Sequence, residues 1–138
     1  MSQIPPPPPS QPSPMGGSPS SVGGNKNLYT ILAWALFPPI GSFIMLFVGK
    51  DDPDVKYNAA TATVIHGGAF IVYIVLWILT IATAGVLGVI LALWGLVWFV
   101  MWIVGVVLAV QANGNRVTFP VVGPMAASYV PMVEGWAK

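Results

Sequence analysis

The strongest constraint on the fold is a stretch of roughly 60 residues, from Tyr57 to Asn115, that contains no Asp, Glu, Lys or Arg. One crossing of a bilayer needs about 20 apolar residues, so this stretch is long enough for more than one crossing. Charged residues make up only 7% of the whole chain, which is too few to cover a water-soluble domain. The sequence therefore predicts an all-α integral membrane protein.

We expect three transmembrane helices, over about 28–48, 59–80 and 87–110. Two crossings fit the uncharged stretch better than three, because three would leave no residues for turns. The segment from Thr80 to Val86 supplies one tight connection. The membrane domain is then expected to cover residues 28–116.

The first span has an interruption at its middle, where the predicted helix break consists of Pro38, Pro39 and Gly41. The two prolines remove two backbone donors and disfavour the helical conformation of the residue before them. A break within hydrocarbon is tolerated only where protein or water satisfies the freed carbonyls, so this face should turn toward the other helices. We interpret it as a packing kink; the alternative is a substrate or ion site, but that would call for a second broken helix in a repeated half.

The loop before the second span carries a good helix start, with Asp52 as the N-cap and Pro53 as the first helical residue. A carboxylate accepts hydrogen bonds at an N-cap, and the missing N–H of proline costs nothing there. The acidic residues of this loop do not resemble the EF-hand spacing, so no metal site is expected.

Two faces are expected on the third span and the turn before it. Small residues that let helix backbones approach form the predicted packing face: Ala84, Gly88, Ala92, Gly105 and Ala109. The tryptophans at i, i+4 and i+8 form a separate stripe for lipid or a partner: Trp94, Trp98 and Trp102. We expect the Gly88 face to pack inside and the Trp98 face to look outward; stacking on a pigment or quinone is the alternative.

His66 is the only histidine, and it lies in the second span beside Gly67 and Gly68. An ionisable group within a membrane is a candidate functional residue, and the glycines leave room for a haem or chlorophyll-type pigment. A single histidine with no intramembrane carboxylate argues against a proton relay or a two-ligand haem. The favoured interpretation is a neutral histidine hydrogen-bonded to a neighbouring helix, with no cofactor.

The two ends of the chain differ from the membrane domain. Residues 1–27 are rich in Pro, Ser and Gly and are expected to form a disordered tail, a spacer rather than a docking arm for an SH3-like groove. Residues 117–138 are apolar but cut by three prolines, so they should lie at the interface or dip into the membrane and return. With three spans, the distribution of basic residues predicts an outside N-terminus and an inside C-terminus.

A resemblance to a known family rests on the order of three elements. These are the interruption at 37–41, a Pro-x-Val-x-x-x-Ala start to the second helix from Pro53 to Ala59, and an Ala-Asn-Gly-x-x-x-x-Phe-Pro segment from Ala112 to Pro120. Over about 29–123 the chain resembles a family of small multi-span bacterial membrane proteins that is related to the chloroplast inner-envelope import component and includes some magnetosome membrane proteins. The resemblance implies a helical protein of a bacterial cell membrane without a known reaction, and a part in protein translocation or organelle organisation.

No catalytic residues are predicted. The chain has no Walker loop, no GxSxG or HExxH motif, no paired intramembrane carboxylate and no cysteine. We therefore expect a non-enzymatic interaction or assembly protein, whose partners are the lipid bilayer and other membrane subunits or a second copy, with no nucleic acid. The alternatives are an accessory subunit of a respiratory or photosynthetic complex and a channel or translocation component.

Overall fold

The computed structural model describes residues 25–138, and this part of the chain is all-helical. Its helices are α1 (Lys26–Ala35), α2 (Ile40–Val48), α3 (Pro53–Ala82), α4 (Gly88–Ala112), α5 (Val122–Ala126) and α6 (Val130–Glu134). The predicted disordered tail, 1–27, lies outside the described residues except for its last three, where α1 already begins. The predicted all-helical fold is confirmed for the described part.

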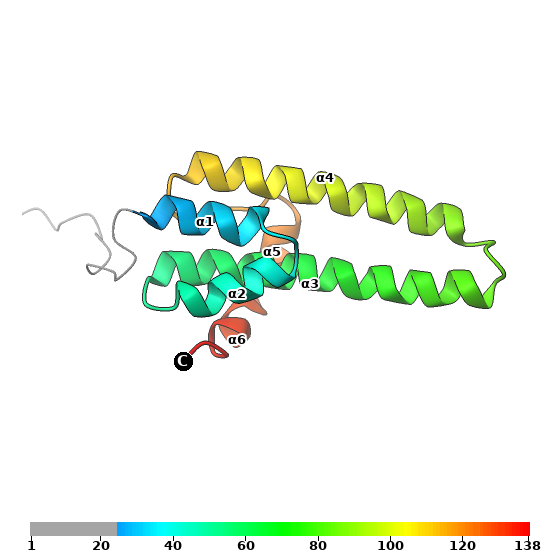
Figure 1. The fold of residues 1–138 in the computed structure, drawn as a ribbon, viewed down its shortest axis with the longest axis horizontal. Coiled ribbons are helices and arrows are strands. Elements are labelled where there is room, and N and C mark those ends of the chain that lie inside the picture. The colour runs from blue at the N-terminus through cyan, green and yellow to red at the C-terminus, as the bar shows by residue number, and fades with distance from the viewer. Residues whose placement is uncertain (1–24) are drawn as a thin grey trace, which may run out of the picture.

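Two of these helices, α3 and α4, are long and apolar enough to cross a membrane. They pack against each other as an antiparallel pair and are the longest elements in Figure 1. α3 starts where the sequence places a helix cap, since Asp52 Oδ1 accepts from the backbone N–H groups of Asp54 and Val55 and Pro53 is the first helical residue. The turn between them uses the positive φ of Gly85, +91°, a conformation that suits glycine.

The first predicted span is a pair of short helices, so three spans are not confirmed. α1 ends at Ala35 and α2 begins at Ile40, and between them the chain reverses its direction (Figure 1). Pro38 and Pro39 are the physical reason, because neither can continue α1. A helix of 9 or 10 residues is only about 15 Å long, roughly half of a bilayer core.

Gly41 lets the two short helices approach at this reversal. A Cβ atom added to Gly41 would lie 2.1 Å from Cβ of Leu36, which is too close for any side chain. The hydroxyl of Ser42 donates to the carbonyl of Pro39 at 2.7 Å. The predicted break is thus a tight reversal rather than a kink within one crossing.

The C-terminal segment packs beside α3. After Arg116 the chain runs inward, and the buried ring of Phe119 stacks on Trp34 with centroids 5.6 Å apart. α5 and α6 then pack against α3 on the return, and the C-terminus lies at the same end as the start of α1 (Figure 1). The predicted placement of the two ends on opposite sides is therefore not confirmed, because the first described segment turns back.

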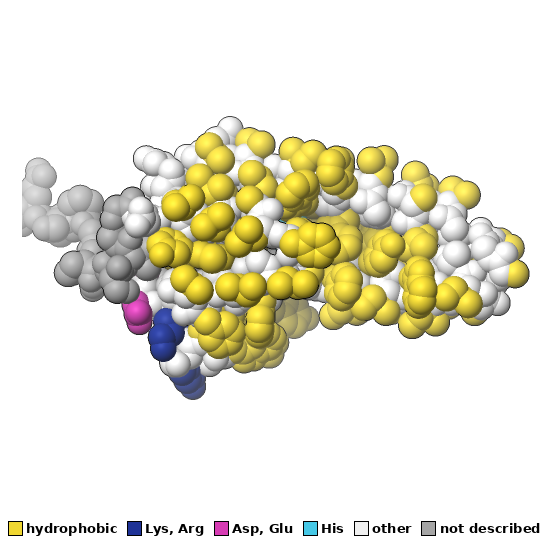
Figure 2. Space-filling model, in the orientation of Figure 1, with side chains coloured by type: hydrophobic (Ala, Val, Ile, Leu, Met, Phe, Trp, Pro, Cys, Tyr) yellow, Lys and Arg dark blue, Asp and Glu magenta, His cyan; other side chains and the backbone are white. Residues whose placement is uncertain are grey.

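The core occupies only one half of the molecule. Every buried residue of α3 lies between Val55 and Ala69, and the buried residues of α4 are Gly105 and Ala109. We call this half, built from α1, α2, α5, α6 and the adjoining ends of α3 and α4, the proximal bundle. We call residues 70–100 the distal hairpin, which consists of the outer parts of α3 and α4 with the turn between them, and whose surface is largely apolar (Figure 2).

Candidate functional site

A buried asparagine ties three segments of the proximal bundle together. Asn58 is fully buried on α3, and its Nδ2 donates to Thr30 Oγ1 of α1 at 3.2 Å and to the carbonyl of Asn115 at 2.9 Å. Its Oδ1 accepts from the backbone N–H of Val117 at 2.7 Å. All its polar atoms are engaged, as buried amides require. Asn58 was not predicted as a site residue from the sequence, although an uncharged polar side chain in an apolar helix often marks a hydrogen bond between helices.

A group of charged residues closes the same end of the bundle. Lys26 at the start of α1 forms an ion pair with Asp54 at the start of α3. Arg116 Nε lies 2.9 Å from the other carboxylate oxygen of Asp54, and its guanidinium sits over the ring of Tyr57 at 4.7 Å from the centroid. Both charged partners of Asp54 come from distant parts of the chain, so these contacts hold α1 and the segment after α4 against α3.

His66 lies at the centre of the proximal bundle and is fully buried. Its Nδ1 accepts from Trp98 Nε1 of α4 at 3.1 Å, so in the neutral ring Nε2 carries the proton. Within the described residues Nε2 has no hydrogen-bond partner. The ring of Trp34 meets the imidazole edge-on with centroids 5.7 Å apart. Because these neighbours enclose the ring, we do not propose a haem or chlorophyll-type pigment at His66.

Two tryptophans of the stripe, Trp94 and Trp98, contact α3, so the expectation that Trp98 looks outward is wrong. Trp94 Nε1 donates to the carbonyl of Ala69 at 3.0 Å, and Trp98 donates to His66. Trp102 is half-buried, with an indole nitrogen that is shielded from solvent. In an apolar environment an indole N–H gains most where it finds an acceptor on a neighbouring helix, which explains why Trp94 and Trp98 point toward α3.

The predicted small-residue face is divided along α4. Gly105 and Ala109 are buried, and a Cβ atom on Gly105 would lie 2.4 Å from Cε3 of Trp34, so this glycine admits α1 to close contact. Gly88 is half-buried near Thr80, whereas Ala84 and Ala92 are exposed. Only the proximal part of the predicted face is covered by α1.

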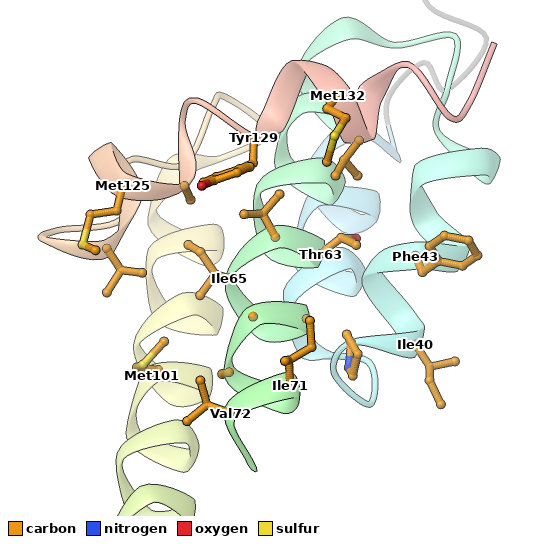
Figure 3. A pocket seen from close by; sticks show the side chains of 18 of the residues that line it. Ile40, Phe43, Thr63, Ile65, Ile71, Val72, Met101, Met125, Tyr129 and Met132 are labelled. Carbon is orange, nitrogen blue, oxygen red and sulfur yellow. The ribbon is translucent and has the colours of Figure 1, made fainter. Parts of the chain in front are cut away.

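An apolar groove of about 930 Å³ runs along α3, between α2 on one side and α4, α5 and α6 on the other (Figure 3). Its floor includes Gly67 and Gly68, and a Cβ atom added to either would meet nothing within 4 Å. Flexible side chains from three elements line its walls: Met101, Met125 and Met132. The two glycines were expected to leave room for a pigment at His66, but they open onto this groove.

A separate hollow of about 410 Å³ lies at the reversal between α1 and α2. Its lining is mostly aromatic and includes Phe37, Trp98 and Trp102, with Gly95 of α4 beside them. A Cβ atom on Gly95 would likewise meet nothing within 4 Å. Gly95 is thus a glycine of similar freedom that lies outside the larger groove.

No three His, Asp or Glu side chains come together as a metal-binding group within residues 25–138. Asp52 and Asp54, the acidic residues at the start of α3, act instead as a helix cap and an ion-pair partner.

The chain matches a known family. The model of the MamF/MmsF family, described as the magnetosome magnetite crystal formation protein family, matches residues 25–126. This range includes the proximal bundle up to α5 and all of the distal hairpin. No curated protein and no solved structure matches the chain.

Proposed function

The chain belongs to the magnetosome magnetite crystal formation protein family, and from this premise we propose that it is a non-enzymatic protein of the magnetosome membrane that takes part in crystal formation by assembling with other membrane proteins. The proposed role in crystal formation rests on the family match over residues 25–126. Two helices suited to cross a bilayer support the membrane location. The assembly role rests on the groove along α3.

The groove has the features of a site for an apolar transmembrane helix. Its glycine floor at Gly67 and Gly68 would let the backbone of a second helix come close, as small residues do at helix interfaces in membranes. Methionine side chains on its walls adapt to different partner surfaces because they are unbranched and polarizable. We therefore propose that the occupant is an apolar helix of another magnetosome membrane protein.

The proximal bundle supports this role by holding the groove open. The polar contacts of Asn58 and the ion pairs of Asp54 fix α1 and the segment after α4 to α3. α5 and α6, which form one wall, pack against α3 next to these contacts. A groove whose walls are already in place loses less conformational entropy when a partner binds.

The experiment uses a magnetite-forming host from which the gene has been removed. We expect its crystals to change in size or number, as seen by electron microscopy, and the full-length chain to restore them. The double variant Gly67→Leu/Gly68→Leu places side chains in the groove at two positions where a Cβ atom meets nothing within 4 Å. It should fail to restore crystals while it accumulates normally in the magnetosome membrane fraction. Gly95→Leu is the matched control and should restore them.

Two results would contradict the proposal at different points. Normal crystals in the strain without the gene would remove the role in crystal formation. Full restoration by the groove-filling double variant would leave that role intact but exclude the groove as the docking site. Photo-cross-linking from Met101 in the membrane fraction provides an independent measurement, since a partner helix in the groove should be captured there and lost in the double variant.

A further inference from the structure

The width of the molecule changes sharply along its length. Between its charged end and Ala69, α3 is surrounded by α1, α2, α4, α5 and α6. Beyond Ala69 only α4 accompanies it, and no residue from 70 to 100 is buried. In Figure 1 the chain accordingly looks like a thick bundle that continues as a slender hairpin.

The step in width falls near the middle of a bilayer. The apolar part of α3, from Ala59 to Ala82, is about 36 Å long at 1.5 Å per residue and so spans a hydrocarbon core of about 30 Å. The wide part, residues 59–69 of α3, is about 16 Å long, close to the thickness of one leaflet. α1 and α2 have the same reach, since they contain 10 and 9 residues.

The charged residues of the proximal bundle fix the position of the molecule across the bilayer. The described Lys, Arg, Asp and Glu residues occur in the segments 26–56 and 116–138, all of which belong to the proximal bundle. The distal turn at 83–87 has none. Ion pairs such as Arg116 with Asp54 must stay at the water-facing border, because charged groups are expensive in hydrocarbon. The wide half therefore fills one leaflet and the narrow half fills the other.

We propose that this chain senses membrane curvature and concentrates where the leaflet that holds its proximal bundle lies on the convex side. Bending a bilayer spreads the convex leaflet and compresses the concave one. A protein with more area in the convex leaflet fills the added space, whereas the reverse orientation increases the strain. The ligand is the bilayer itself, recognised by its shape through rigid helices rather than by an amphipathic helix that inserts into packing defects.

The test uses the full-length chain with a fluorophore at Lys138, which is exposed at the charged end. The protein is reconstituted into giant vesicles of phosphatidylcholine and phosphatidylglycerol, and a narrow tube is pulled outward. A membrane-impermeant quencher separates molecules whose charged end faces out from those whose charged end faces in. We expect the outward-facing molecules to be enriched in the tube relative to the vesicle, and the inward-facing molecules to be depleted.

A matched variant tests whether shape is the cause. Ala82→Phe/Val89→Phe/Ala92→Phe widens the distal hairpin at positions whose side chains are exposed. We expect it to reduce the enrichment of the outward-facing molecules. Equal partition of both orientations, the opposite sign, or unchanged enrichment in the triple variant would overturn the proposal. The assay contains no partner and no mineral, so its failure would leave the proposed function untouched.

Discussion

The two halves of α3 are both apolar, yet they are built from different residues and do different work. The buried half contains small and polar side chains: Asn58, Ala59, Ala60, Thr61, Ala62 and His66. The distal half contains large exposed ones, such as Ile71, Trp77 and Ile81. In a membrane, lipid is as apolar as leucine, so packing selects small and hydrogen-bonding residues while large apolar ones face the lipid. Hydropathy alone therefore shows where a helix lies, but residue size shows which part of it is packed.

This comparison predicts that similar substitutions should destabilise the protein when made in the proximal bundle and should be nearly neutral in the distal hairpin. The first three substitutions below are at positions that belong to the proximal bundle or bond to it, and each is paired with a distal position that does not bond to it.

The largest effect is expected at glycines of α4. Gly105→Leu would place a side chain where Cε3 of Trp34 already lies 2.4 Å from the Cβ position, so we expect a loss of about 3 kcal/mol or more in the free energy of unfolding. Gly95→Leu, on the same helix, meets open space and should change it little. Thermal unfolding in mild detergent, together with the yield of monodisperse protein, measures both. Equal losses of unfolding free energy in the two variants would contradict the proposed difference between the two halves.

The buried amide should come next. Asn58→Leu leaves the N–H of Val117 and the carbonyl of Asn115 without their partner, which we expect to cost about 2 to 3 kcal/mol. Thr80→Val in the distal half removes a hydroxyl that bonds only to the carbonyl of Leu76 in its own helix, and it should be nearly neutral. Hydrogen exchange at Val117 offers a second measurement, since its amide should lose protection in the first variant alone.

A smaller effect is expected from the tryptophan stripe. Trp98→Phe removes the donor to His66 Nδ1, and we expect a loss of about 1 kcal/mol. Trp77→Phe, at an exposed distal tryptophan, is the control and should leave the stability unchanged. If Trp98→Phe were as neutral as Trp77→Phe, the hydrogen bond from Trp98 to His66 would make no measurable contribution to stability.

Sequence reasoning predicted the membrane location and the start of α3 because both follow from local composition. Hydropathy over residues 59–110 identifies the two long helices, and Asp52 with Pro53 identifies the helix start. It predicted one span over 28–48 where the structure has two short helices, because length and hydropathy do not show whether a proline pair bends a helix or reverses it. The outcome depends on packing against distant elements, here of α2 against α3 and of α1 against α4.

The same limit applies to the side chains of the site. The i, i+4, i+8 spacing revealed that Trp94, Trp98 and Trp102 share a face of α4, but not which neighbour that face meets. The groove at Gly67 and Gly68 was equally hidden, since its walls come from α2, α4 and the C-terminal helices. Asn58 was missed because its three partners are 28, 57 and 59 residues away in the chain.

The smallest effect is expected at the charged border of the proximal bundle. Arg116 Nε lies 2.9 Å from Asp54, but its side chain is 55% exposed, so we expect Arg116→Gln to cost only about 0.5 kcal/mol. The difference from the unchanged protein should shrink in high salt, because screening already weakens this pair. Lys138→Gln, at an exposed residue outside the ion pairs described above, is the control and should change neither the stability nor its salt dependence. A loss for Arg116→Gln as large as that for Asn58→Leu would mean that charge rather than the buried amide holds the segment after α4 to α3, and that the border of the bundle matters as much as its interior.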